Sequence, residues 1–168
     1  GLRAIAVLAV IFYHAQITVL GYQPFKGGFI GVDIFFVISG YLITSIILKE
    51  LNNTGKLSFK YFYERRVRRI LPALLFVMLV SLPFAWIYLL PDSFINFSKS
   101  ILYSIGFTSN LYFHFTEQQY GAESSEVIPL LHTWSLSVEE QYYILFPIVL
   151  LFVFKYLKKY LIYILILS

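Results

Sequence analysis

The chain of 168 residues contains no cysteine, and only 13% of its residues are charged. The missing cysteines exclude disulfide bonds and thiolate chemistry, and they leave the redox compartment open. The low charge excludes an ordinary soluble domain, in which about 25% of residues are charged. The abundant residues are instead apolar: 59% are hydrophobic, 20% are aromatic, and the mean hydropathy is +0.75. The composition therefore indicates an integral membrane protein.

The basic residues indicate how the chain is oriented in the membrane, and they do not indicate nucleic-acid binding. The net charge is +4, and the cations sit in short polar segments between apolar runs. Eleven of the 13 basic residues are Arg3 or lie within residues 49–69 or 155–159. By the positive-inside rule, these three places are cytoplasmic.

The apolar runs predict an all-α, polytopic transmembrane helix bundle with about four full spans in this chain. The expected spans cover about residues 2–20, 29–48, 70–90 and 131–154, and each is long enough to cross a bilayer. Pro72 would then lie in the first turn of the third span, where its missing N–H does little harm.

Two further segments are ambiguous. Residues 94–115 are apolar but contain several serines and asparagines. A full crossing there would place residues 155–159 outside, so we expect a re-entrant or interfacial helix. Residues 160–168 resemble the start of a further span that is cut short. We therefore interpret residues 1–168 as the N-terminal part of a longer membrane domain, truncated at both ends.

Ionisable residues interrupt the first two spans. His14 follows Arg3 by eleven residues, so on a helix the two share nearly one face, about 16 Å apart along the axis. An ionisable side chain within a span is costly unless it faces a polar cavity, which favours a function. The alternative for His14 is a hydrogen bond that packs two helices together. Asp33, near the start of the second span, is either paired in a polar cavity or a helix cap.

Four arginines precede the third span. On a helix, Arg66 shares a face with Arg69, and Arg65 shares the adjacent face with Arg68. Guanidinium groups suit phosphate oxygens, so this cluster is a candidate site for a phosphate-bearing ligand. The alternative is that the arginines only hold the segment inside and touch anionic lipid.

The last span opens with an unusually polar stretch. His132, Ser135 and Glu139 recur at three and four residues, which predicts that they share one helical face. Glu140 is rotated toward Trp134. Two glutamates with a histidine and hydroxyl groups suggest a polar pocket, and a structural salt-bridge network is the alternative.

Taken in their order along the chain, these motifs resemble those of the acyltransferase 3 family of multi-pass bacterial membrane O-acyltransferases. The resemblance covers essentially the whole chain and implies a fold of about ten helices, of which this chain would be the N-terminal half. The matching residues are Arg3 with His14, Gly31–Val32–Asp33 through Ser39–Gly40, Arg66–Val67–Arg68–Arg69, and His132–Thr133–Trp134–Ser135–Leu136 with Glu139.

The resemblance implies an acyl-CoA donor, usually acetyl-CoA, reached from the cytoplasm. It implies an acceptor hydroxyl on an envelope glycan or glycolipid, such as O-antigen, exopolysaccharide or peptidoglycan. The expected location is the bacterial inner membrane, with membrane lipid as the other partner and no nucleic acid. Some members carry a C-terminal extracytoplasmic hydrolase-like domain. No metal is expected, because the three histidines lack ligand spacing, and the sequence carries no signal for an oligomeric state.

Within this interpretation His14 is the general base, and Asp33 or Glu139 orients its imidazole. The arginines bind the donor; they are Arg3, Arg65, Arg66, Arg68 and Arg69. The polar pocket binds the acceptor, and its residues are His132, Trp134, Ser135 and Glu140.

Three other functions compete with acyl transfer. The main alternative is a proton-coupled transporter that uses an intramembrane histidine and carboxylate relay. An intramembrane serine protease is disfavoured, because Val37 and Ile38, rather than a glycine, precede Ser39. A lipid-binding scaffold would not need His14.

Overall fold

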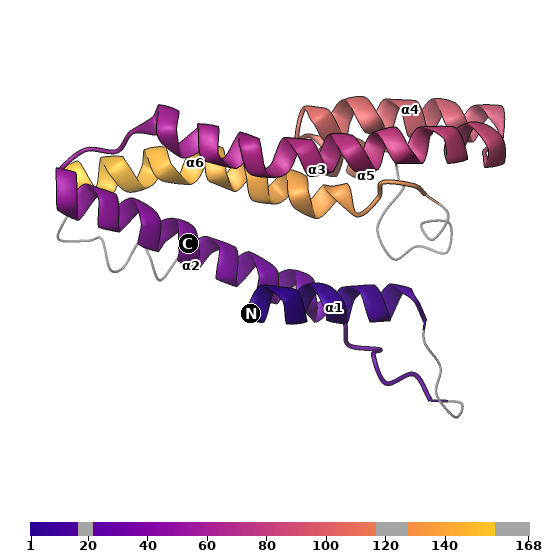
Figure 1. Cartoon of the computed structure of the whole chain (residues 1–168), viewed down its shortest axis with the longest axis horizontal. Coiled ribbons are helices and arrows are strands. Elements are labelled where there is room, and N and C mark those ends of the chain that lie inside the picture. Colours follow the sequence, from indigo (N-terminus) through magenta and orange to yellow (C-terminus); the bar gives the residue numbers. More distant parts are fainter. Residues whose placement is uncertain (17–21, 117–127, 157–168) are drawn as a thin grey trace. The chain divides into compact units, whose positions relative to one another are not determined.

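The computed structural model describes residues 1–16, 22–116 and 128–156, and the regular elements in these ranges are the six helices of Figure 1. The chain divides into two compact units, Gly1–Lys56 and Leu57–Ser168, and each is described by itself. The all-α prediction is confirmed for the described part of the chain.

The first unit is an antiparallel pair of helices, α1 (Leu2–His14) and α2 (Ile30–Thr54). Glycine permits their close approach. A Cβ atom added to Gly31 would lie 2.8 Å from Cγ2 of Val10, and Gly28 is equally tight against α1. Small residues at such a crossing are typical of helix pairs in membranes, because they let the two backbones come together.

The second unit contains four helices, with α6 antiparallel to α3 (Figure 1). The Tyr63 hydroxyl on α3 donates to the carbonyl of Ile144 on α6, at 3.1 Å. The two shorter helices pack between the second half of α3 and the start of α6. The bounds are Phe59–Tyr88 for α3, Pro91–Ile105 for α4, Ser109–Phe115 for α5 and Thr133–Tyr156 for α6.

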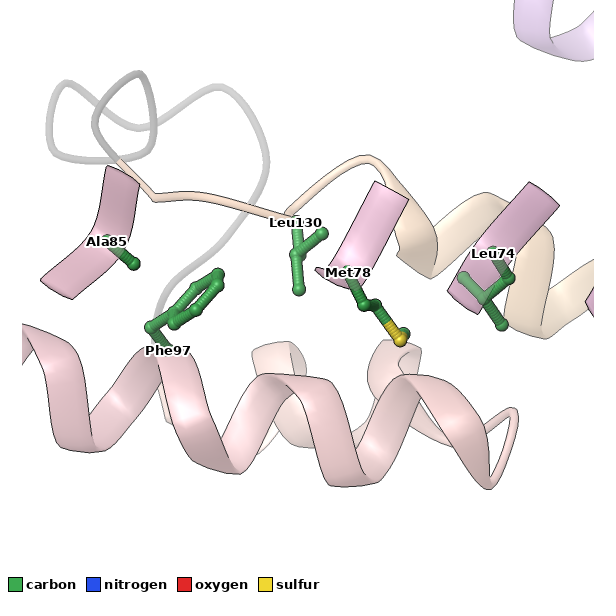
Figure 2. Close-up of a cluster of buried hydrophobic side chains, with 5 residues drawn as sticks. All are labelled: Leu74, Met78, Ala85, Phe97 and Leu130. Atoms are coloured by element: carbon green, nitrogen blue, oxygen red, sulfur yellow. The ribbon is translucent and has the colours of Figure 1, made fainter. Parts of the chain in front are cut away.

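An apolar cluster holds the second unit together. Figure 2 shows the side chains of Phe97, Leu130 and Met78 pointing into the space between α3 and α4. Leu74 and Ala85 extend the cluster along α3. Burial of these side chains fixes α4 along the second half of α3.

The spans differ from the prediction in two places. Three described helices, α2, α3 and α6, are long and apolar enough to cross a membrane. The helix α1 ends at His14 and is shorter than the span expected over residues 2–20, of which residues 17–20 lie outside the described part. The predicted start of a further span, residues 160–168, and residues 157–159 of the basic cluster also lie outside it.

The third span begins earlier than expected. The helix α3 starts at Phe59, so Pro72 lies in its interior rather than in its first turn. The four arginines are therefore on the helix and not in a loop. Hydropathy treats a charged run as a loop, yet arginine and glutamate are good helix formers. The ion pair between Arg68 and Glu64, at 2.7 Å and four residues apart, stabilises this turn.

Residues 94–115 do not form one spanning helix, as expected. The helix α4 ends at Ile105, and Phe107 takes the left-handed conformation, with φ +52°. The chain then reverses, so that the ring of Tyr112 on α5 stacks on that of Tyr103 on α4, with centroids 4.7 Å apart. With 15 and 7 residues, neither helix of this hairpin is long enough to cross a membrane, and its re-entrant or interfacial placement stays a prediction.

Candidate functional site

Arg3 is anchored to α2 within the first unit. Its Nη2 atom donates to the hydroxyl of Ser39 at 2.7 Å, and its guanidinium carbon lies 5.1 Å from the ring centre of Phe35. The Nε atom of Arg3 is buried and has no hydrogen-bond partner among the described residues. The arginine is thus held in place by two contacts while one N–H remains unpaired within this part of the chain.

His14 is the last residue of α1, and its side chain is exposed. Its Nδ1 atom lies 2.9 Å from the carbonyl oxygen of Val10. A carbonyl can only accept a hydrogen bond, so Nδ1 carries the proton. In the neutral ring, Nε2 then carries the lone pair, which is the state that a general base needs.

Asp33 does not orient the His14 imidazole in this structure. The Nδ1 atom of His14 is oriented by the backbone of Val10 instead. Because α1 and α2 are antiparallel and Gly31 lies opposite Val10, Asp33 is displaced from the His14 end of α1. Its side chain is exposed. A catalytic role for Asp33 therefore stays a prediction, and the printed partner of the His14 Nδ1 atom is the carbonyl one turn earlier in its own helix.

Arg66 lies between two aromatic rings in the second unit. Its guanidinium carbon is 3.8 Å from the ring centre of Tyr143 and 4.9 Å from that of Phe62. Phe62 is one turn earlier on α3, whereas Tyr143 belongs to α6, so this arginine bridges the two helices. Its Nε atom is buried, with no hydrogen-bond partner among the described residues.

Two buried glutamates from α6 accompany Arg66. Glu139 is 9% exposed and Glu140 is 8% exposed, and both interact electrostatically with the arginine. The Tyr143 hydroxyl donates to Glu139. The Oε1 atom of Glu140, in contrast, is buried and lacks a hydrogen-bond partner within the described part of the chain. Leaving such an atom unpaired costs about 1–3 kcal/mol, so it marks a place where a ligand group would be stabilising.

The other three arginines lie at the surface of the unit. The guanidinium of Arg65 stacks on the Tyr61 ring at 4.6 Å, and Arg68 forms its ion pair with Glu64. Arg69 is exposed and interacts electrostatically with Glu140. The predicted sharing of faces therefore holds along the helix, but only Arg66 is enclosed by aromatic and acidic side chains.

The remaining residues predicted for the polar pocket lie at the start of α6 or just before it. His132 is exposed and precedes α6, which begins at Thr133. The Ser135 hydroxyl donates to the carbonyl of His132 at 3.0 Å, an arrangement of the first helical turn. Trp134 packs on the apolar cluster of Tyr112, Phe113 and Leu131. Ser135 and Glu139 are four residues apart on α6 and share a face of it, whereas His132 lies one residue before the helix begins.

An amide pair, here called the polar clasp, joins the α4–α5 hairpin to α6. The Nε2 atom of Gln141 donates to the Phe107 carbonyl at 2.9 Å and to Oδ1 of Asn110 at 3.0 Å. Asn110 donates back to the Gln141 side chain at 3.2 Å. The clasp thus satisfies a backbone carbonyl at the tip of the hairpin.

A chain of buried hydroxyls continues along the same face of α6. Ser104 bonds to Thr133 at 2.8 Å, Thr133 to Ser109 at 3.1 Å, and Ser109 to Ser137 at 2.7 Å. The sequence analysis missed the clasp and this hydroxyl chain. The available signal was the spacing of Thr133, Ser137 and Gln141 at four residues, which places three polar side chains on one face of an apolar helix.

The whole chain matches a known protein family. A family model described as an acyltransferase domain covers residues 1–168. A Staphylococcus aureus (strain COL) protein, provisionally named an O-acetyltransferase, is 45% identical over 159 residues, or 95% of this chain. O-acetyltransferase OatA of S. aureus (strain NCTC 8325 / PS 47) is 41% identical over 158 residues, or 94% of this chain. The chain spans 25% of the length of each relative. No solved structure matches it.

Proposed function

Because the chain belongs to the acyltransferase domain family, we propose that the full-length protein is an O-acetyltransferase of the bacterial inner membrane. It transfers an acetyl group from cytoplasmic acetyl-CoA to a hydroxyl of an envelope glycan or glycolipid. The names of the relatives support O-acetyl transfer, and the three long apolar helices support a membrane location. Under the positive-inside rule, Arg3 and residues 49–69 lie on the cytoplasmic side.

The observation that carries this proposal is the hydrogen bond between His14 and Val10. It fixes the proton on Nδ1, so the neutral ring takes up a proton at Nε2. His14 removes the proton of the acceptor hydroxyl, and the oxygen attacks the acyl carbonyl carbon. The thioester C–S bond then breaks, and the CoA thiolate takes the proton from His14. A general base of this kind contributes about 10²–10⁴-fold to the rate.

The donor is bound through arginines. Arg65, Arg68 and Arg69 are exposed on α3 and suit the phosphate groups of the donor. In the first unit, the buried Nε atom of Arg3 supplies a further N–H for an oxygen of the donor. Ser39 positions this arginine through its hydrogen bond to Nη2.

The experiment uses the full-length protein in liposomes with acetyl-CoA and a purified envelope glycan. We expect His14→Ala to lower acetyl transfer by about 10²–10⁴-fold. The matched control is His114→Ala, because His114 is exposed on α5 and lies outside the proposed site. Wild-type rates from His14→Ala would refute the role of the histidine. Proton-coupled flux without any acetyl transfer by the wild type would refute the function and favour the transporter.

A further inference from the structure

We propose that Arg66 and Glu140 bind a neutral hydrogen-bonding group of the substrate rather than a phosphate. The group accepts from Arg66 and donates to Glu140. A carboxamide of the pantetheine arm of the donor has this chemistry, as does a hydroxyl of the acceptor sugar. The inference rests on the proposed function, because that function supplies both substrates.

The charges around Arg66 argue against a phosphate. Arg66 interacts electrostatically with Glu139 and Glu140, and Glu140 also interacts with Arg69. Arg66 and Arg69 thus already interact with acidic side chains of α6. A phosphate placed beside Arg66 would bring negative charge against two buried acidic side chains, and burying such charge is costly where water is excluded.

The unpaired atoms specify what the site binds. The Nε atom of Arg66 is a donor, Oε1 of Glu140 is an acceptor, and neither has a hydrogen-bond partner among the described residues. The two atoms therefore do not satisfy each other. A ligand group that pairs with both must carry an acceptor for Arg66 and a donor for Glu140, as an amide or a hydroxyl does.

The aromatic rings hold Arg66 in this role. Its guanidinium lies 3.8 Å from the Tyr143 ring centre and 4.9 Å from the Phe62 ring centre, so its plane is confined. Tyr143 is in turn held by its hydrogen bond to Glu139. A guanidinium fixed by stacking loses little conformational freedom when it binds, and it is not free to swing toward an exposed phosphate.

The test measures binding by the full-length protein in lipid nanodiscs. The probes are acetyl-CoA and adenosine 3′,5′-bisphosphate, which carries phosphate groups but no pantetheine arm. We expect Glu140→Gln to weaken acetyl-CoA binding about tenfold, because the amide oxygen still accepts a hydrogen bond but without the charge, and to leave adenosine bisphosphate binding unchanged. Arg69→Ala should weaken binding of both probes. Asp92→Asn, an exposed acid-to-amide change on α4, is the matched control.

The two sources of the ligand group give different results. If the group belongs to the acceptor, Glu140→Gln raises the KM for the glycan and leaves acetyl-CoA affinity unchanged. Either pattern supports the neutral site. Weaker binding of adenosine bisphosphate by Glu140→Gln, or no change in any of the three measurements, overturns it. Glu140→Asp, which keeps the charge but is one methylene shorter, repeats the test should Glu140→Gln fold poorly. A wild type that binds no acetyl-CoA would instead refute the proposed function.

Discussion

The crossing of α1 and α2 offers a direct test of how the first unit holds Arg3. At Gly31, an added Cβ would lie 2.8 Å from Cγ2 of Val10 and also against the carbonyl oxygen of Ala6. The valine can turn, but the backbone oxygen cannot. Gly31→Ala must therefore push the two helices apart.

The size of the effect follows from these distances. Carbon atoms pack at about 3.5–4.0 Å, so the helices must separate by about 1 Å. The same shift stretches the 2.7 Å bond between Arg3 and Ser39 beyond the range of a good hydrogen bond. Overpacking costs about 1–3 kcal/mol, whereas replacing glycine with alanine in a helix returns about 1 kcal/mol. We expect a net loss of up to about 2 kcal/mol in stability and a raised KM for acetyl-CoA.

The assay combines thermal unfolding in detergent with acetyl-transfer kinetics of the full-length protein. Gly27→Ala is the matched control, because a Cβ at Gly27 meets nothing within 4 Å. The control should behave like the wild type. If Gly31→Ala is as stable as Gly27→Ala and has the same KM, the reasoning about the helix crossing is wrong.

Three further substitutions test other contacts. Gln141→Leu leaves the Phe107 carbonyl unpaired in an apolar setting and should lower stability by about 1–3 kcal/mol in thermal unfolding; an unchanged Tm would contradict the clasp. Phe97→Ala removes a side chain that is 2% exposed and should lower the free energy of unfolding by about 3–5 kcal/mol in the same measurement. A loss of stability below about 1 kcal/mol would contradict the apolar cluster around Phe97. Ser39→Ala removes the hydrogen-bond acceptor of Arg3 and should raise the KM for acetyl-CoA about fivefold, and Ser39→Thr should restore it. The same KM for Ser39→Ala and the wild type would refute this positioning role.

The sequence predicted the helices well, but not all of their ends. Hydropathy located the apolar part of α3, and it missed the charged turns before it because a solvated helix and a loop have the same polarity. The end of α1 at His14 was missed for a different reason. The apolar run continues beyond His14, so hydropathy alone gives no signal to stop the helix there.

The candidate site was also predicted only in part from the sequence. Helical spacing correctly predicted which arginines share a face, because that depends only on the period of the helix. It could not single out Arg66, because the difference between Arg66 and Arg69 arises from Tyr143 and Phe62. Enclosure by a ring from another helix depends on the register between α3 and α6, which no local pattern in the sequence encodes.

The rotation of α6 about its axis links the hairpin to the acidic pair. Gln141 directly follows Glu140, so the two side chains point about 100° apart, the first toward α5 and the second toward Arg66. Thr133 and Ser137 repeat the contact with Ser109 on the Gln141 face, at intervals of one turn. A rotation that moved Glu140 would break these bonds together. The clasp and the hydroxyl chain therefore fix the direction of the Glu140 carboxyl, although none of their residues touches Arg66.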